Sequence, residues 1–323
     1  MRDVHIGPLP PTLNGISIYL YRLSKIDKSS QFIDWNKINK FKQFLIWLLK
    51  QSFNYPNKKQ YIYHPPSLNQ RLLLYFFSWT NLYKYSIVIH GNPLFVQYNN
   101  SNVITKSFIR KMLERAKYIQ VVNPIYKKLI NDYLKIENRN VIVKTAFLPP
   151  PLEEETQIQK TYERELIEFL DNRKPIIVSN AAALIFYNGI DLYGLDLCIE
   201  LAKLLKKDYP NLGFLFAIAD NKINEIYLKK MKIKVNEYNL KRNFYFMTGQ
   251  KELWPIFKKA DLVVRATNRD GYGSSIAEAL YFNCLAVASN VCKRPKGTIL
   301  FKNRNLEDFY NKSKSLLQKN VKD

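Results

Sequence analysis

Short apolar runs alternate with amphipathic segments along the second half of the chain. Residues 175–181 and 213–220 form nearly continuous apolar runs, whereas residues 195–210 carry apolar side chains at spacings of three and four. The runs predict strands that are buried on both faces, and the three-and-four spacing predicts an amphipathic helix. After residue 220 the pattern predicts a helix over 224–239, a strand over 243–249, a short helix over 251–260, a strand over 261–267, a helix from about Ser275 and a strand over 285–290. This alternation predicts a parallel sheet with helices on both faces.

The first half repeats the alternation less regularly. It predicts strands over 3–7, 61–64 and 85–91 and helices over 16–26, 40–53 and 68–83, and the alternation continues through 105–116, 118–123, 124–135 and 140–151. A proline-rich and then acidic stretch at 147–155 lies near the middle of the chain, as a linker would. The length of 323 residues also favours two domains. We therefore expect an α/β fold with two Rossmann-like domains, over 1–150 and 172–304, a linker over 151–171, and a last helix within 305–323 that could cross back onto the first domain.

The chain carries a large excess of positive charge. Its 50 Lys and Arg residues against 27 Asp and Glu residues give a formal net charge of +23. This charge attracts polyanions, which include nucleic acid, anionic lipid headgroups and phosphorylated substrates. Lys, Asn, Ile, Tyr and Phe are abundant throughout, so an AT-rich coding sequence explains part of the charge as well. Because the lysines do not form the arginine-rich, glycine-punctuated runs of RNA-binding segments, nucleic acid is the less favoured partner.

The apolar runs also bear on localisation. No run of about 18 uncharged apolar residues is present, and residues 1–11 lack the apolar region of a secretory signal. We expect a cytoplasmic protein. Residues 37–53 combine lysines with Phe41, Phe44, Trp47 and Phe53, which fits a helix on an anionic membrane surface. An amphipathic helix packed on the first sheet is the alternative, and both remain open at this point.

The cysteines and histidines show no metal-binding spacing. The three cysteines, Cys198, Cys284 and Cys292, are interpreted as reduced packing residues. The three histidines, His5, His64 and His90, are scattered along the chain, and His5 is expected to be structural. The sequence therefore predicts no metal ion.

Glycine is scarce, with 10 in 323 residues, yet several glycines lie where a predicted strand meets a helix. They are Gly7, Gly15, Gly91, Gly249, Gly271 and Gly273. In open α/β sheets, ligands bind beyond the carboxyl ends of the strands, where glycine lets a backbone approach closely. Gly271 and Gly273 precede the amides of Ser274 and Ser275 at a helix start, so they predict a phosphate-binding turn. A turn that only needs a positive φ is the simpler alternative.

Two carboxylates bracket this turn. Asp270 lies in the loop, and Glu278 follows eight positions later in the helix. Carboxylates beside a phosphate repel it unless they accept hydrogen bonds from hydroxyl groups, such as those of a sugar or a ribose. The spacing from Ser275 to Glu278 also fits a capping box, which would be purely structural.

The stretch from Asp270 to Glu278, followed by LAVASN at 285–290, resembles the acidic-x7-acidic signature of family-four retaining glycosyltransferases, which have the GT-B fold. The resemblance is stronger to the branch with an Arg-x4-Asp-Gly core and a later Arg-Pro-x-Gly. The matching residues are Arg265, Asp270, Gly271, Arg294, Pro295 and Gly297. Weaker similarity extends to 8–15, 87–91 and 191–201. The resemblance implies two parallel sheets that face each other across a cleft, with a nucleotide sugar between the domains.

The resemblance also implies roles for individual residues. Glu278 would hold the ribose hydroxyls, and Asp270 the donor-sugar hydroxyls. The other implied donor-binding residues are Asn14, Gly15, Gly249, Gly271, Tyr272, Gly273, Ser274, Ser275 and Arg294. His90 would lie near the reacting face of the donor sugar, although a histidine that ends an apolar strand can equally be a core residue. The implied catalytic set is His90, Asp270, Glu278 and Arg265. The resemblance implies no metal or other cofactor.

The chain departs from the family where an Arg and a Lys normally follow the first C-terminal strand. Within residues 179–194, Tyr193 stands where the Lys would be. A leaving diphosphate needs positive charge nearby, because electrostatic stabilisation is usually the largest catalytic contribution. Arg265, Arg269 and Arg294 could supply that charge, and structural surface pairing is the alternative for each of them.

The expected function is therefore sugar transfer, with retention, from a nucleoside-diphosphate sugar to a hydroxyl acceptor. The acceptor class implied by the resemblance is a glycan or lipid-linked glycan in cell-surface polysaccharide synthesis. A sugar-nucleotide epimerase or phosphorylase of the same fold, a basic nucleic-acid-binding protein and a non-catalytic scaffold remain alternatives.

Overall fold

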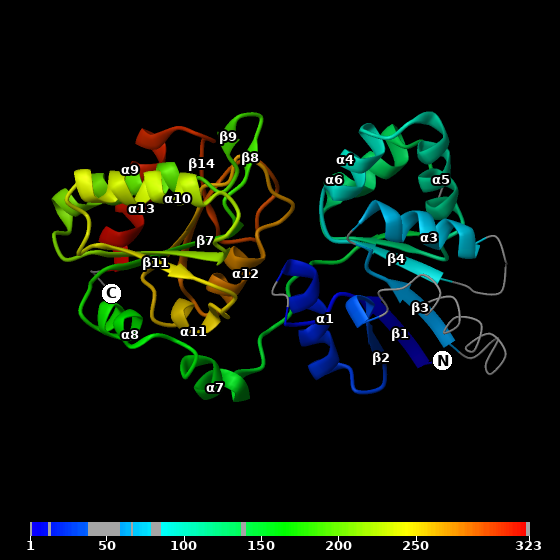
Figure 1. The fold of residues 1–323 in the computed structure, drawn as a ribbon, viewed down its shortest axis with the longest axis horizontal. Coiled ribbons are helices and arrows are strands. Elements are labelled where there is room, and N and C mark those ends of the chain that lie inside the picture. The colour runs from blue at the N-terminus through cyan, green and yellow to red at the C-terminus, as the bar shows by residue number, and fades with distance from the viewer. Residues whose placement is uncertain are drawn as a thin grey trace. The chain divides into compact units, whose positions relative to one another are not determined.

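The computed structural model of the chain describes residues 2–11, 14–37, 59–65, 67–78, 85–136 and 140–320. The chain divides into two compact units, Met1–Leu148 and Pro149–Asp323. Each unit contains a sheet of six parallel strands with helices packed against it (Figure 1). The α/β class and the two Rossmann-like sheets predicted from the sequence are confirmed. The predicted helix over 40–53, with its membrane-binding interpretation, lies outside the described residues.

The first unit is built on a sheet with the strand order β2-β1-β3-β4-β5-β6. Its strands are β1 (Arg2–Gly7), β2 (Gln31–Asp34), β3 (Lys59–Tyr63), β4 (Tyr85–Ile89), β5 (Ile119–Val121) and β6 (Val141–Val143). Its helices are α1 (Gly15–Ile26), α3 (Leu68–Ser78), α4 (Pro93–Asn99), α5 (Val103–Glu114) and α6 (Pro124–Lys128), with a 3₁₀ turn at Trp35–Lys37 and a π-helical turn at Leu129–Tyr133. Strand β4 is buried along its whole length, as its continuous apolar run predicts.

The second unit has the strand order β11-β10-β7-β12-β13-β14. Its strands are β7 (Ile176–Ala183), β10 (Gly213–Asp220), β11 (Phe244–Thr248), β12 (Leu262–Arg265), β13 (Leu285–Ser289) and β14 (Ile299–Phe301), and a separate hairpin pairs β8 (Phe186–Tyr187) with β9 (Ile190–Asp191). Its helices are α7 (Glu155–Gln159), α8 (Arg164–Asp171), α9 (Leu195–Asp208), α10 (Glu225–Glu237), α11 (Trp254–Phe257), α12 (Ser274–Tyr281) and α13 (Leu306–Asn320), with a 3₁₀ turn at Leu152–Glu154.

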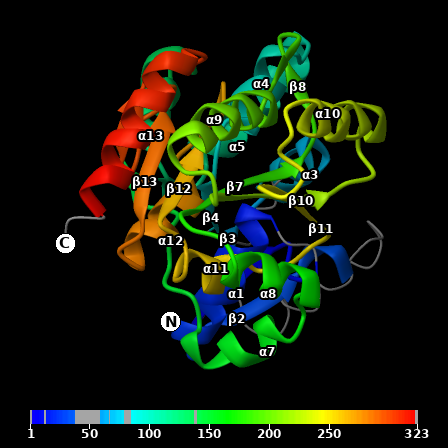
Figure 2. The same ribbon diagram turned by 90° about the vertical axis from the view of Figure 1, so that its left-hand side faces the viewer.

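Helices cover both faces of the second sheet (Figures 1 and 2). Successive side chains of β7 point to opposite faces, so Ile177 joins the core under α9, α10 and α13, whereas Ile176 and Val178 join the core under α8, α11 and α12. The side chains of β7 therefore face an apolar core on each side of the sheet, which explains why most of its positions are apolar.

The segment expected to be a linker, 151–171, forms helices that belong to the second unit. In α8, Leu166 and Leu170 are spaced by four and lie on one face of the helix, and both are buried in the same core cluster as Trp254. The acidic, proline-containing composition of this segment concealed this apolar stripe. The second unit begins at Pro149, and its first helical turn begins at Leu152, so the connection before this turn is short.

The last helix, α13, packs against α9 and the sheet of its own unit. Phe309 of α13 is fully buried and stacks on Phe301 of β14, with 4.2 Å between the ring centroids. The described part of α13 therefore completes the core of the second unit. No helix among the described residues has the length and apolarity needed to cross a bilayer.

The strand order of each sheet reverses at one point. In the first sheet β1 is followed by β2 on one side and by β3 on the other, and in the second sheet β7 is followed by β10 on one side and later by β12 on the other. Loops at the carboxyl ends of such strands diverge, and ligands of open α/β sheets bind there. The two reversal points locate the regions where functional residues are expected.

Candidate functional site

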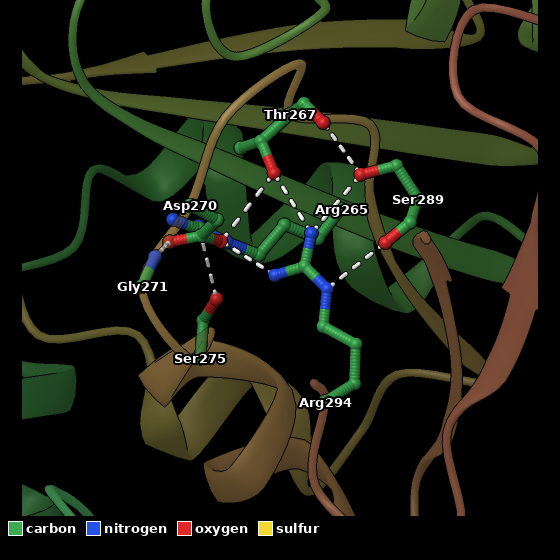
Figure 3. Close-up of polar contacts among 7 residues, drawn as sticks. All are labelled: Arg265, Thr267, Asp270, Gly271, Ser275, Ser289 and Arg294. Carbon is green, nitrogen blue, oxygen red and sulfur yellow. Dashed lines mark hydrogen bonds and ion pairs between the residues drawn. The ribbon is translucent and has the colours of Figure 1, made fainter. Parts of the chain in front are cut away.

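The loop that follows β12 in the second unit is held by a cluster of three charged residues (Figure 3). Arg265 Nε donates to Asp270 Oδ2, and Arg294 Nη1 donates to the same oxygen at 2.5 Å. Arg265 ends β12, next to the reversal point of the sheet, and Arg294 comes from the loop that follows β13. The structure therefore brings together three residues that the sequence analysis selected.

Arg294 is committed to holding the loop. Its Nε donates to the carbonyl oxygen of Ser289 at 3.0 Å, and its Nη2 donates to the hydroxyls of Thr267 and Ser289 at 2.9 and 3.0 Å. Its side chain is only 1% exposed, and a buried guanidinium must be paired and hydrogen-bonded to be tolerated. Arg294 thus joins the ends of β12 and β13 to Asp270, and this network differs from the phosphate contact that the sequence analysis gave it.

Asp270 is ionised in this cluster. Burial alone would raise its pKa, but the guanidinium groups of Arg265 and Arg294 outweigh burial and hold the pKa of Asp270 well below its usual range. Its Oδ1 accepts the N–H of Gly271 at 2.9 Å, and its Oδ2 also accepts the Thr267 hydroxyl at 3.4 Å. Oδ2 therefore accepts from three protein donors, whereas Oδ1 accepts one hydrogen bond from the described residues.

Arg265 retains a free donor. Its Nη1 donates to Ser275 Oγ at 3.3 Å, and its Nη2 has no hydrogen-bond partner among the described residues. Two arginines and one aspartate leave the cluster with one net positive charge. Four of the five N–H groups of Arg294 are bonded within the protein and its side chain is 1% exposed, whereas Arg265 is 13% exposed and keeps an Nη2 that no described residue bonds, so Arg265 is the arginine of this cluster that is better placed to contact a ligand.

Helix α12 begins with uncapped amides beside Arg265. Gly273 is its N-cap, and no described side chain caps it. The amides of Ile276 and Ala277 donate to the Gly273 carbonyl at 3.0 and 3.2 Å, which leaves those of Ser274 and Ser275 without an intrahelical acceptor. The alternative of a Ser275–Glu278 capping box is wrong, because the helix starts one residue earlier and the Ser275 hydroxyl accepts from Arg265. Such a helix N-terminus favours an anion.

Gly273 is required for this geometry on two grounds. Its φ is +88°, a conformation that L side chains rarely adopt, and a Cβ at this position would lie 2.9 Å from Arg294 Nη1. Gly271 does not have a positive φ, and its amide donates to Asp270 Oδ1.

Glu278 lies further along α12 and is 8% exposed. Burial raises the pKa of Tyr162 beyond its usual range, and the neighbouring charges of Glu252 and Glu278 add to this effect. The Tyr162 hydroxyl donates to the carbonyl of Glu252 at 2.7 Å. Glu278 is therefore largely buried, and its charge lies near enough to Tyr162 to raise the pKa of that hydroxyl.

The connection between β7 and α9 supports the loop from its other side. The ring of Tyr193 lies 5.8 Å from the Arg265 guanidinium, and the ring of Tyr187 lies 4.6 Å from that of Arg269. Tyr193 occupies the position where the resemblance places a lysine, and its ring lies against the Arg265 guanidinium. These tyrosine–arginine contacts are cation–π interactions. The sequence analysis missed the β8–β9 hairpin because its two-residue strands are too short to show a period.

Asp191 and Gly194 fix this connection in place. The Asp191 carboxylate accepts the amides of Tyr193 and Leu195 at 2.9 and 2.8 Å and the hydroxyl of Tyr227 at 2.9 Å. Gly194 has a φ of +71°, and a Cβ there would lie 2.4 Å from the carbonyl oxygen of Ala266. The start of α9 is thus packed directly on the backbone that follows β12.

Gly249 is not part of this cluster. It follows β11, the edge strand, and two strands separate β11 from β12 in the sheet. Its φ is +95°, and its amide donates to the Ile218 carbonyl at 3.0 Å. These contacts account for a glycine at this position without a ligand.

In the first unit, Asn14 caps α1. Its Oδ1 accepts the amides of Ile16 and Ser17, both at 3.0 Å, and Ser17 Oγ accepts the amide of Asn14 at 2.9 Å. This reciprocal cap occupies both the side-chain oxygen and the amide of Asn14, which the resemblance implied as a donor-binding residue. The neighbouring Gly15 is exposed, and a Cβ there would meet no atom within 4 Å.

The three histidines of the chain form a continuous row in the first unit. His5 Nδ1 lies 3.1 Å from His64 Nε2, and His64 Nδ1 lies 2.8 Å from His90 Nε2. Burial lowers the pKa of His5 to about 4 and that of His90 to about 3, and burial together with the two neighbouring rings lowers the pKa of His64 well below its usual value. The sequence analysis treated these residues as scattered, because only the sheet order places β1, β3 and β4 side by side.

The row does not converge on a point. Among the described residues, no group of three or more His, Cys, Asp or Glu side chains is placed to hold a metal ion.

Comparisons with known proteins find similarity in family and in fold. Residues 170–320 match the family model described as Glycosyl transferases group 1. No curated protein matches the sequence. Among solved structures, the chain is similar to Anabaena HepE in complex with UDP, with a TM-score of 0.72 and 9% identity over 98% of this chain and 90% of that one.

Two further structures show the same fold. A trehalose-phosphate synthase from Burkholderia xenovorans, in complex with glucose-6-phosphate, has a TM-score of 0.70 and 10% identity over 98% of this chain and 92% of that one. A glycosyltransferase from Rickettsia africae has a TM-score of 0.67 and 14% identity over 98% of this chain and 88% of that one. At these identities the likeness establishes the architecture.

Proposed function

We propose that this chain is a glycosyltransferase that moves a sugar from a nucleoside-diphosphate sugar to a hydroxyl acceptor, with retention. The match of residues 170–320 to the family model described as Glycosyl transferases group 1 supports this proposal. One observation carries the proposal: the uncapped N-terminus of α12 adjoins the free Nη2 of Arg265 at the reversal point of the second sheet. Amides and a guanidinium that converge in this way form a site for a diphosphate.

The proposed reaction breaks the anomeric C–O bond to the diphosphate and forms a C–O bond to the acceptor oxygen. The acceptor proton passes to the departing diphosphate on the same face of the sugar. The charge that develops on the diphosphate is stabilised by the amides of Ser274 and Ser275 and by Arg265. In this scheme Asp270 orients Arg265, and its Oδ1 accepts one hydroxyl of the donor sugar. Glu278 is proposed to hold the ribose hydroxyls, as the family resemblance implies.

A uridine nucleotide is the first donor to test. The HepE structure contains UDP, and the Burkholderia trehalose-phosphate synthase is described as UDP-forming. For the acceptor we propose a glycan or lipid-linked glycan of the cell surface. The net charge of +23 supports an acceptor on an anionic membrane surface.

The proposal is tested by incubating the protein with UDP-glucose, UDP-galactose and UDP-N-acetylglucosamine, each with and without a mixed glycan acceptor, and measuring the release of UDP. We expect one donor to release UDP in an acceptor-dependent way and to raise the melting temperature. Donor turnover that is independent of acceptor, with an epimerised sugar nucleotide as the product, would instead support an epimerase. Melting temperatures that no nucleotide sugar changes would contradict the proposal.

A further inference from the structure

The histidine row of the first unit forces its three rings to share one tautomer. Each contact joins an Nδ1 to an Nε2: His5 Nδ1 with His64 Nε2, and His64 Nδ1 with His90 Nε2. A neutral imidazole carries one N–H and one acceptor nitrogen, and each contact needs one of each. If His5 carries its proton on Nε2, so must His64 and His90, and if His5 carries it on Nδ1, the other two must as well.

All three rings are neutral around pH 7, which this pairing requires. Burial lowers the pKa of each histidine, and that of the central ring, His64, is lowered further by its two neighbours. The charged groups that act on His5 are Asp27 and Lys144, which have opposite effects on its pKa. An added proton would turn an acceptor nitrogen into a donor and break the row.

The far end of the row decides between the two tautomers. His90 Nδ1 is buried and has no hydrogen-bond partner among the described residues, whereas no nitrogen of His5 or His64 is left in that condition. In the Nδ1–H arrangement His90 would bury an N–H with no acceptor, which is the rarer and costlier defect in proteins. In the Nε2–H arrangement every N–H in the interior of the row is bonded, and His90 presents a lone pair.

The row lies at the reversal point of the first sheet. His5 is in β1, and His64 and His90 directly follow β3 and β4, the next two strands in the sheet. Tyr19 of α1 packs edge-on against His90, with 5.0 Å between the ring centroids. A buried acceptor without a donor at the place where such sheets bind ligands indicates a ligand contact.

We propose that His64 and His5 are positioning residues that hold His90 in the Nε2–H tautomer, so that His90 Nδ1 accepts a hydrogen bond from a hydroxyl group of a bound sugar. The identity of the ligand rests on the proposed function, but the shared tautomer does not. His64 touches no ligand in this arrangement and acts only through His90.

The tautomers can be measured directly, because the chain contains only three histidines. Protein labelled with ¹⁵N-histidine gives three ring systems in a long-range ¹H–¹⁵N correlation spectrum at pH 7, where protonated and bare nitrogens resonate far apart. We expect three neutral rings, all protonated on Nε2. A mixture of tautomers among the three rings, or protonation on Nδ1, would overturn the proposal.

Adding UDP-glucose to the labelled protein tests the ligand contact. Once a rise in melting temperature shows that UDP-glucose binds, we expect the His90 Nδ1 resonance to shift while the His5 resonances stay in place. Bound UDP-glucose that leaves His90 Nδ1 unmoved would overturn the contact. If UDP-glucose does not bind at all, the proposed donor fails, while the tautomer result stands on its own.

A double-mutant cycle tests positioning. His90→Asn keeps an acceptor oxygen near the place of Nδ1 and has no tautomer, so the row cannot act through it. We expect His64→Phe to weaken UDP-glucose binding about two- to twelvefold in the natural protein, the range for one hydrogen bond, and to have no further effect in His90→Asn. Equal losses in both backgrounds would show that His64 is merely structural. If His64→Phe does not fold, the spectrum of the unsubstituted protein still decides the proposal.

Discussion

Arg294 Nη1 and Asp270 Oδ2 lie 2.5 Å apart although 24 positions separate them in the chain. The contact is almost fully buried and joins the loop after β12 to the loop after β13. Arg294, the arginine of the Arg-Pro-x-Gly stretch, therefore holds the loop of Asp270 in position through a buried ion pair.

Replacing Arg294 by methionine removes one partner of this buried pair and leaves the Thr267 and Ser289 hydroxyls without their donor. We expect the free energy of unfolding to fall by about 3 kcal/mol, measured by urea denaturation. The control is Arg304→Met. The side chains of Arg304 and Asp196 are 29% and 27% exposed, so solvent screens this pair more than the Arg294–Asp270 pair, and we expect the substitution to cost about 1 kcal/mol or less. Equal losses of unfolding free energy in the two variants would show that the buried Arg294–Asp270 pair contributes no more to stability than the more exposed Arg304–Asp196 pair.

Gly273→Ala places a methyl group against Arg294 Nη1 in a backbone conformation that alanine avoids. We expect a loss of about 1–3 kcal/mol of stability and weaker donor binding, because the start of α12 must move. Denaturation and nucleotide titration provide the two measurements. Gly15→Ala is the matched control: its φ is not positive and its Cβ would lie in open space, so its stability should stay the same or rise by up to about 1 kcal/mol.

Arg265→Gln removes the cation that the cluster offers to a diphosphate. We expect kcat of sugar transfer to fall about 100-fold or more, since a preorganised donor to developing charge is lost. The control, Arg164→Gln, deletes an 89% exposed arginine of the same unit and should leave kcat unchanged. A kcat close to normal in Arg265→Gln, with the fold verified by its melting temperature, would refute the role of Arg265.

Acid should destabilise the protein through the histidine row. The pKa of folded His5 is about 4 and that of His90 about 3, both below the unfolded value of about 6.5. The unfolded chain therefore binds these protons first, so their contribution to stability is complete above pH 6.5 and is lost as the pH falls toward 4 and 3. Between pH 6 and 5 we expect the free energy of unfolding to fall by about 1.4 kcal/mol per pH unit for each of these histidines, measured by urea denaturation.

His5→Gln should reduce that slope by the share of one histidine. A slope unchanged in His5→Gln would mean that the acid sensitivity comes from other groups.

Much of the fold could be predicted from the pattern of the chain. Buried parallel strands such as β7 and β10 are apolar at most positions, and helices such as α9 carry their apolar residues on one face, so both can be recognised from the local sequence. Short elements were missed, including β2, α4, the β8–β9 hairpin and β14. Strand β14 has only three residues, and two of them, Ile299 and Leu300, are exposed at the edge of the sheet. So short a run has no period that distinguishes a strand from a loop.

The site could be predicted in its members but not in its contacts. Asp270, Gly273 and Arg265 were selected because a strand, a glycine turn and a helix follow one another in sequence. The commitment of Arg294 to Ser289 and Thr267 depends on the pairing of β12 with β13, and the histidine row depends on β1, β3 and β4 being neighbours. The order of strands in a sheet cannot be predicted from the local sequence pattern. The contacts of Arg294 and the histidine row can therefore be seen only in the structure.

Gly194 has a consequence for how two loops pack. Because no side chain separates it from Ala266, the two loops beside the reversal point of the second sheet touch backbone to backbone. Even one methyl group would act as a wedge between them. Separating these loops would break this contact, so the absence of a side chain at Gly194 is what lets the start of α9 pack against the loop after β12.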